Sequence, residues 1–204
     1  MDKQDYLNQI SATSKPPKQG KKGIFGSIYF KLGVGALVAL IVIMILGAIL
    51  SSGKGGVKQD SIALKVRLDN TMEMITTYQT DVKSSSLRSS SASLYGVLSN
   101  TNSALTKYLE DNYAFREKDV DDKTASEAEA AKEELNTELF SAKINGILDR
   151  IYAHKMAYEI AIIASNENSL RKQTDDEALL SIIDTSYNSL NNLYNQFNDF
   201  SETK

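Results

Sequence analysis

The sequence lacks several residue types that common functional sites require. It has no Cys, a single His and no Trp among its 204 residues. The absence of Cys excludes disulfides, thiol catalysis, Cys-ligated zinc, iron–sulfur clusters and a lipidated Cys. One His excludes a metal site with several His ligands within one chain. We therefore expect no metal and no cofactor.

The chain also has little Pro and no excess of positive charge. The two Pro residues, Pro16 and Pro17, are adjacent, so the rest of the chain is free to be helical. The net charge is −3, and we expect no nucleic-acid partner because such proteins usually present a basic face. Neither a Gly-rich phosphate loop after a strand nor a Gly-x-Ser-x-Gly elbow occurs. The sequence thus predicts a protein that is not an enzyme.

One long apolar run divides the chain. Residues 32–50 are nineteen residues without a charge. At 1.5 Å per residue they form about 28 Å of helix, which matches the hydrocarbon thickness of a bilayer. Residues 24–50 are therefore predicted to be a transmembrane signal-anchor with its interfacial flank, and the lipid bilayer is a predicted partner. Cleavage near Ser51 and Gly53 is the alternative.

The charges on either side of this run predict its orientation. Residues 1–31 have six Lys and two Asp, a balance of +4, whereas residues 51–204 have 17 basic and 24 acidic residues, a balance of −7. The positive-inside rule places the N-terminus in the cytoplasm and the C-terminal part outside the cytoplasmic membrane. Residues 1–23 are predicted to be a disordered basic cytoplasmic tail, and residues 51–58 a Gly/Ser linker.

Residues 59–201 have apolar side chains at helical spacing throughout. We expect an all-α fold in which the single N-terminal transmembrane helix is followed by an extracytoplasmic antiparallel helical bundle of four helices, or three if the first two fuse. The helices are expected at residues 59–83, 86–112, 124–165 and from 174 onward. A kink or break at Gly146 in the third helix is an alternative. Capping boxes predict helix starts at Thr124 and Thr174.

The predicted core positions form one stripe on each helix, similar to the seam of a coiled coil. In the first two helices they are Leu64, Leu68, Met72, Ile75 and Val82, then Leu87, Leu94, Leu98, Thr101, Leu105 and Tyr108. In the third and fourth they are Phe140, Ile144, Ile147, Ile151, Tyr158 and Ile162, then Leu179, Ile183, Tyr187, Leu190, Tyr194 and Phe197.

Three groups of residues are candidates for binding. His154 falls on the predicted stripe of the third helix, where it is either a ligand contact or pH-sensitive group, or a hydrogen-bonded His at the edge of the bundle. Gly35 and Ala39 form a small-xxx-small pair that can join membrane helices, although such pairs also arise by chance. The third group is an uncharged polar face on the last helix.

This face extends from Thr185 to Asn198, fourteen positions without a charged residue. It is formed by five Asn side chains, Asn188, Asn191, Asn192, Asn195 and Asn198. A solvated helix face normally has charges, and interface cores are depleted in charge. The face is therefore a candidate contact surface for another protein, a second copy of the chain or a surface glycan. A general bias of the sequence toward Asn and Ser is the alternative.

These features together predict a membrane-anchored structural or protein-interaction module, with a protein partner or self-association. A small-ligand-binding or sensor domain within the bundle is the alternative. A sensor needs an apolar pocket between the helices with a few inward polar groups, whereas a filled core favours the interaction module.

Overall fold

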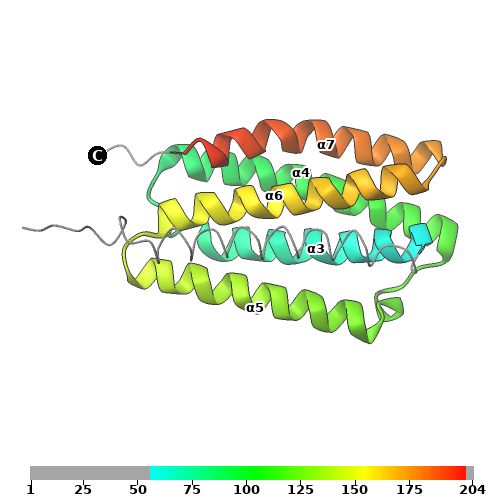
Figure 1. Ribbon diagram of the computed structural model, residues 1–204, viewed down its shortest axis with the longest axis horizontal. Helices are drawn as coiled ribbons and strands as arrows, with labels where there is room; N and C mark the ends of the chain where they lie inside the picture. The colour runs from blue at the N-terminus through cyan, green and yellow to red at the C-terminus, as the bar shows by residue number, and fades with distance from the viewer. Residues whose placement is uncertain (1–55, 201–204) are drawn as a thin grey trace, which may run out of the picture. The chain divides into compact units, whose positions relative to one another are not determined.

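The computed structural model describes residues 56–200, and every secondary-structure element in this range is helical. The elements are α3 (Gly56–Tyr78), α4 (Ser85–Tyr113), the 3-10 helix η2 (Glu117–Asp119), α5 (Asp122–Ile144), α6 (Leu148–Gln173) and α7 (Glu177–Asn198) (Figure 1). The all-α prediction is confirmed. The described residues form five α-helices rather than four, and the first two stay separate.

Consecutive helices run antiparallel and are joined by short connections (Figure 1). Helices α3, α4, α7 and α6 form a ring, in which each helix packs against the next around one core. Helix α5 lies outside the ring and packs against α3 and α6. The described residues are therefore a four-helix bundle with a fifth helix along one edge.

The core side chains of three helices follow the predicted stripes. On α3 and α4 every predicted position is buried except Met72, which is half-buried, and the predicted Val82 is buried just beyond the end of α3 at Tyr78. On α7 the buried positions are Leu179, Ile183, Leu190 and Phe197, whereas Tyr187 is exposed and Tyr194 is half-buried. Burial of these Leu, Ile and Phe side chains, at about 1.5–3 kcal/mol each, is the main force that assembles the bundle.

The prediction of one continuous third helix is wrong, and the alternative of a break is confirmed. Helix α5 ends at Ile144 and α6 begins at Leu148. Between them Gly146 has φ of +71°, and the N–H of Ile147 donates to the carbonyl of Ala142 at 3.0 Å. A left-handed Gly with a hydrogen bond that reaches back five residues is a common helix stop, because Gly has no Cβ to clash.

The apolar stripe predicted for that helix is wrong for the same reason. Phe140, Ile144 and Ile147 are exposed, and Ile151, Tyr158 and Ile162 are only half-buried. The prediction assumed that one helix continues through Gly146, whereas the chain turns back there and a new helix begins. The core positions of α6 lie on another side of the helix and include Tyr152, Met156, Ile160 and Ile163. Helix α6 thus has apolar side chains on two sides, one that is buried in the ring and one that is only half-buried, and it packs against α5 as well as against α3 and α7.

Asp residues, rather than the predicted Thr residues, cap α5 and α7. The Asp121 carboxylate accepts from the Thr124 N–H at 2.9 Å and from its hydroxyl at 2.7 Å, and these bonds hold the pKa of Asp121 below its ordinary value. At α7, Asp176 accepts from the Leu179 N–H at 3.0 Å. Thr174 instead accepts the N–H of Asp176. A carboxylate combines the cap hydrogen bond with a favourable charge at the helix N-terminus.

None of the helices between residues 56 and 200 is both long and apolar enough to cross a membrane. The predicted tail, residues 1–23, and anchor, residues 24–50, lie outside the described residues, as do Gly35 and Ala39. Helix α3 begins at Gly56 and so includes the end of the predicted linker, residues 51–58.

Candidate functional site

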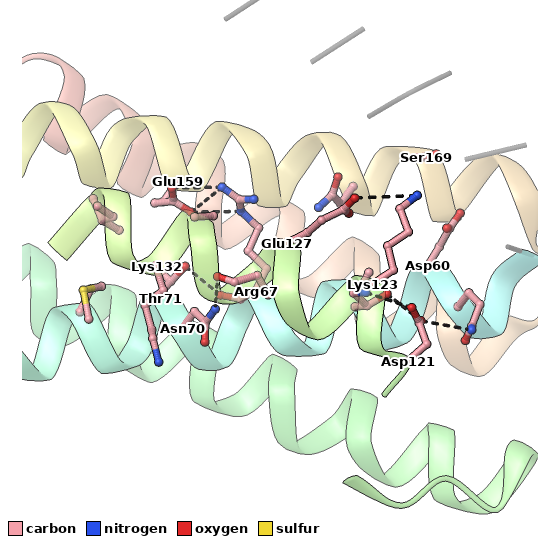
Figure 2. Close-up of a pocket in the computed structure, with 18 residues that line it drawn as sticks. Asp60, Arg67, Asn70, Thr71, Asp121, Lys123, Glu127, Lys132, Glu159 and Ser169 are labelled. Atoms are coloured by element: carbon pink, nitrogen blue, oxygen red, sulfur yellow. Dashed lines mark hydrogen bonds and ion pairs between the residues drawn. The ribbon is translucent and has the colours of Figure 1, made fainter. Parts of the chain in front are cut away.

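A polar groove of about 500 Å³ lies between α3, α5 and α6 (Figure 2). It exists because the N-terminal half of α5 does not pack closely on the ring. Helix α5 buries only Leu135, Leu139 and Ala142, which all lie in its C-terminal half. Figure 1 shows α5 diverging from α3 toward its N-terminal end. The groove is thus a wedge under the less buried half of one helix.

An ion pair crosses this groove. Arg67 on α3 donates from Nε to Glu159 Oε2 at 3.0 Å and from Nη2 to Glu159 Oε1 at 3.1 Å (Figure 2). The Glu159 side chain is 10% exposed, so the pair is shielded from bulk water. Such a bidentate pair fixes both partners and joins α3 to α6.

The other charged groups of the groove are also partnered. Lys132 contacts Glu129 at 2.8 Å, and Lys123 contacts Glu127 at 3.8 Å. Asp60 accepts from the side chain of Gln173 at 2.8 Å. Among the described residues the cations of the groove are therefore in ion pairs, whereas the carboxylates of Asp60 and Asp121 accept hydrogen bonds from uncharged groups only.

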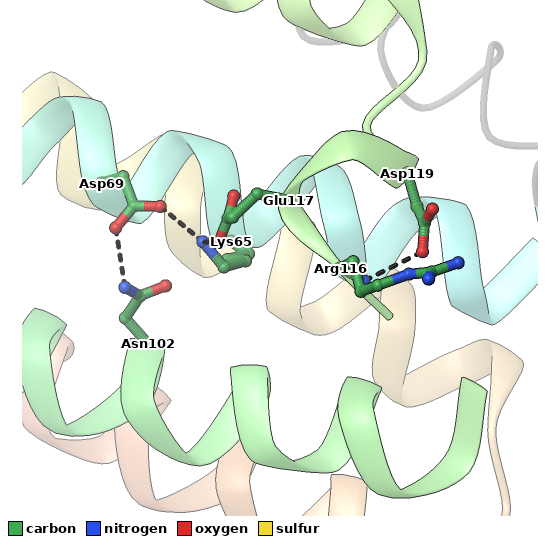
Figure 3. A network of polar contacts seen from close by, with 6 residues as sticks. All are labelled: Lys65, Asp69, Asn102, Arg116, Glu117 and Asp119. Atoms are coloured by element: carbon green, nitrogen blue, oxygen red, sulfur yellow. Dashed lines mark hydrogen bonds and ion pairs between the residues drawn. The ribbon is translucent and has the colours of Figure 1, made fainter. Parts of the chain in front are cut away.

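A second polar cluster fastens the connection between α4 and α5 to α3 (Figure 3). Lys65 on α3 contacts Asp69 and Glu117, each at 2.8 Å, and its side chain is only 5% exposed. Asn102 on α4 donates to the same Asp69 at 2.7 Å. Burial lowers the pKa of Lys65, but the hydrogen bonds to Asp69 and Glu117 outweigh it, so the pKa lies above its ordinary value. The network is a structural clamp.

Glu167 of α6 is the most unusual titratable group of the core. It is fully buried, and neither carboxyl oxygen has a hydrogen-bond partner in the described residues. Burial raises its pKa to about 8, and the Ser186 hydroxyl of α7, which lies near the carboxyl without forming a hydrogen bond, lowers the pKa only in part. A buried carboxyl is neutral below its raised pKa because the charged form is poorly solvated there. No sequence pattern indicated the burial of Glu167, because its neighbours in the chain are polar.

A small hollow of about 190 Å³ lies on the outer side of the α6–α7 pair. Ile160, Ala161 and Ala164 of α6 form one wall. The other wall, on α7, is formed by Tyr187, Asn191 and Tyr194. The hollow is lined by uncharged side chains only.

The predicted Asn face is exposed in full, since all five of its Asn side chains are exposed. Asn191 is the member that lines the α6–α7 hollow, and Asn198 donates to Asp199 at 3.2 Å. His154 is exposed and does not lie on the core stripe of α6. His154 is two residues beyond Tyr152, and the ring centroids of Tyr152 and Phe197 are 6.4 Å apart. His154 therefore lies at the level of the last turn of α7.

Sequence reasoning missed an exposed apolar cluster at the turn between α5 and α6. It consists of Phe140, Ile144 and Ile147, which are 55%, 68% and 37% exposed. We call it the α5–α6 apolar tip. The signal that could have identified it is Gly146, because a helix that stops there removes these three side chains from the core stripe.

Within residues 56–200, no group of three or more acidic or His side chains is arranged to hold a metal ion. No family model, curated protein or solved structure matches the chain.

Proposed function

We propose that the protein is a single-pass membrane protein that presents its helical bundle outside the cytoplasmic membrane as a protein-interaction module. The membrane anchor is supported by the uncharged run at residues 32–50, which is long enough to span a bilayer. The orientation is supported by the basic balance of residues 1–31 against the acidic balance of residues 51–204.

The observation that carries the interaction function is the α5–α6 apolar tip. Phe140 and Ile144 are one helical turn apart on the outer side of α5, and Ile147 follows in the turn. Exposed apolar side chains that cluster in this way mark contact sites, because their burial against a partner removes apolar surface from water. The occupant we propose is an apolar patch on another protein.

Topology is tested by single Cys substitutions, for which the chain is well suited because it has no native Cys. A Cys at Ser201 should react with a membrane-impermeant maleimide in intact cells, and a Cys at Ser14 should react only after permeabilisation. The reverse pattern would overturn the orientation.

Partner binding is tested by a photoreactive amino acid at Ile144 in intact cells, with the exposed Lys118 at the other end of the bundle as the matched control position. We expect a discrete crosslinked product from Ile144 only, and we expect Phe140→Ser to abolish it. Equal yields from both positions would contradict the proposal. A product of twice the chain mass would identify the partner as a second copy.

A small-ligand-binding function of the bundle is the second candidate, and the groove between α3, α5 and α6 favours it by its volume, although its lining is polar and not the apolar pocket expected for a sensor. Its volume of about 500 Å³ lies within the usual range for ligand pockets. Asn70 and Asn166 line it from α3 and α6. If the groove binds a ligand, Asn166→Leu should remove the thermal stabilisation that a cell extract of small molecules gives to the wild-type chain.

A further inference from the structure

The hollow on the outer side of α6 and α7 combines aromatic rings with carboxamides. Tyr187 and Tyr194 are seven residues apart on α7, which places them two turns, or about 10.5 Å, apart along the helix. Asn191 lies between them, and at 100° per residue all three fall within about 60° of one another. The α7 wall of the hollow is therefore one strip of Tyr, Asn and Tyr.

The opposite wall explains why the hollow exists. Ala157, Ala161 and Ala164 of α6 follow each other at spacings of four and three, so they lie on one side of that helix. Ala161 and Ala164 line the hollow with Ile160. A methyl side chain does not reach as far as a Tyr ring, so the surface is recessed along α6 beside the rings of α7.

The residues that line the hollow on the α7 side are uncharged, and the nearest charge on that helix is Asp184, which pairs with Arg171 of α6 at 3.2 Å. Thr185 to Asn198 contains no charged residue, in a chain in which 24% of residues are charged. Asn188 and Asn195 are exposed on the same helix and add two further carboxamide side chains beside the hollow. Tyr187 is 43% exposed, so its ring is open to solvent.

We propose that this face binds a neutral oligosaccharide chain. A sugar ring has hydroxyls that both donate and accept, and an Asn carboxamide offers two donors and one acceptor to match them. The C–H groups on a sugar face are apolar and weakly positive, which suits the negative face of a Tyr ring. The lining offers a charged ligand no counter-charge, and the nearest charges, Arg171 and Asp184, already pair with each other, so the face favours a neutral ligand.

The hollow is too small to enclose a whole ligand, so the ligand that we propose is a chain of which the hollow holds one part. About 190 Å³ is less than the usual volume of a ligand pocket, so only part of a chain is enclosed and each contact is weak. A polysaccharide repeats the same unit, so many weak contacts from many copies in one membrane add up to firm attachment. The inference rests on the proposed function in that the bundle must face the cell exterior to meet such a chain.

The test uses the purified full chain in a detergent without a sugar headgroup. Chitotriose and cellotriose are the neutral probes, and trigalacturonate is the charged comparison. Saturation-transfer difference NMR detects weak binding through the signals of the ligand. We expect a millimolar dissociation constant for a neutral trimer and no saturation transfer to trigalacturonate. Tyr187→Ala and Asn191→Ala should each weaken binding at least fivefold, with unchanged helicity because both side chains are exposed.

Tyr95→Ala is the matched control, because Tyr95 on α4 is 42% exposed, close to the 43% of Tyr187, and does not line the hollow. It should leave binding unchanged. The proposal is overturned if neither neutral trimer receives transfer, if Tyr95→Ala weakens binding as much as Tyr187→Ala, or if sedimentation shows a dimer that Tyr187→Ala dissociates. Each of these results leaves the crosslinking from Ile144 and the topology unaffected, so the two proposals fail separately.

Discussion

The buried carboxyl of Glu167 makes the stability of the bundle depend on pH in a direction that is unusual for an acidic group. In the folded protein burial raises its pKa to about 8, against an ordinary value of 4.5. Below pH 4.5 the carboxyl is protonated in both the folded and the unfolded states and has no effect on the pH dependence. Between these two values only the unfolded state releases the proton, so the free energy of unfolding falls as pH rises.

The magnitude follows from the size of the shift. Each pH unit in this window lowers the free energy of unfolding by about 1.4 kcal/mol, so the loss reaches roughly 3 kcal/mol at pH 7 and levels off above the folded pKa. Glu167→Gln keeps the size and polarity of the neutral side chain but does not titrate. The variant and the wild type should therefore be similar near pH 4.5, and the variant should be the more stable at pH 7.

The measurement is urea denaturation followed by circular dichroism across this pH window, on a fragment of residues 57–204, which we expect to fold by itself and to be highly helical. The difference between the two proteins isolates Glu167, because all other groups titrate alike in both. Glu127→Gln, at an exposed position in α5, is the control and should change stability by less than about 0.5 kcal/mol. Parallel curves for wild type and Glu167→Gln would refute the reasoning.

Three further predictions concern stability. Gly146→Ala should destabilise the bundle by about 1–2 kcal/mol because Gly146 has φ of +71°. Gly96→Ala inside α4 should stabilise it by about 0.5–1 kcal/mol, because an added Cβ meets no atom within 4 Å there. Urea denaturation that shows the same sign for both variants would contradict this. Leu98→Ala should lower the free energy of unfolding by about 2–5 kcal/mol because Leu98 is fully buried. Ile147→Ala at the α5–α6 apolar tip should lower it far less, because Ile147 is 37% exposed. Similar denaturation midpoints for the two variants would count against the observed packing of α5 and α6. Glu159→Gln should destabilise the bundle by roughly 1–3 kcal/mol because it weakens a shielded bidentate ion pair. In a double-mutant cycle, the double variant with Arg67→Met should recover part of that loss. Strictly additive losses would show that the two side chains do not interact.

The helices were predictable from sequence where each helix has one apolar side. On α4 the positions from Leu87 to Tyr108 follow one stripe, and all of those predicted are buried. The prediction was wrong on α6, where Ile151 and Tyr158 on one side compete with Met156 and Ile160 on the other. Periodicity alone does not tell which of two apolar sides faces the core, because the answer depends on where α5 packs.

The candidate sites depend on contacts between helices that are distant in sequence, and this limited their prediction. The exposure of the Asn face on α7 followed from helical periodicity alone. The ion pair between Arg67 and Glu159 joins residues 92 positions apart, and no local pattern indicates it. The burial of Glu167 likewise depends on the ring of helices around α6, whereas its own neighbours in the sequence are polar.

The position of α5 outside the ring has a consequence for hydrogen exchange. Its N-terminal half, residues 122–134, buries no side chain fully, so little apolar surface opposes its separation from α3 and α6. Amide protons there should exchange through a local opening that costs far less free energy than global unfolding, whereas those of α4 and α7 should exchange only when the whole ring opens. We therefore expect hydrogen exchange to divide the bundle into two cooperative units, of which the less stable borders the groove.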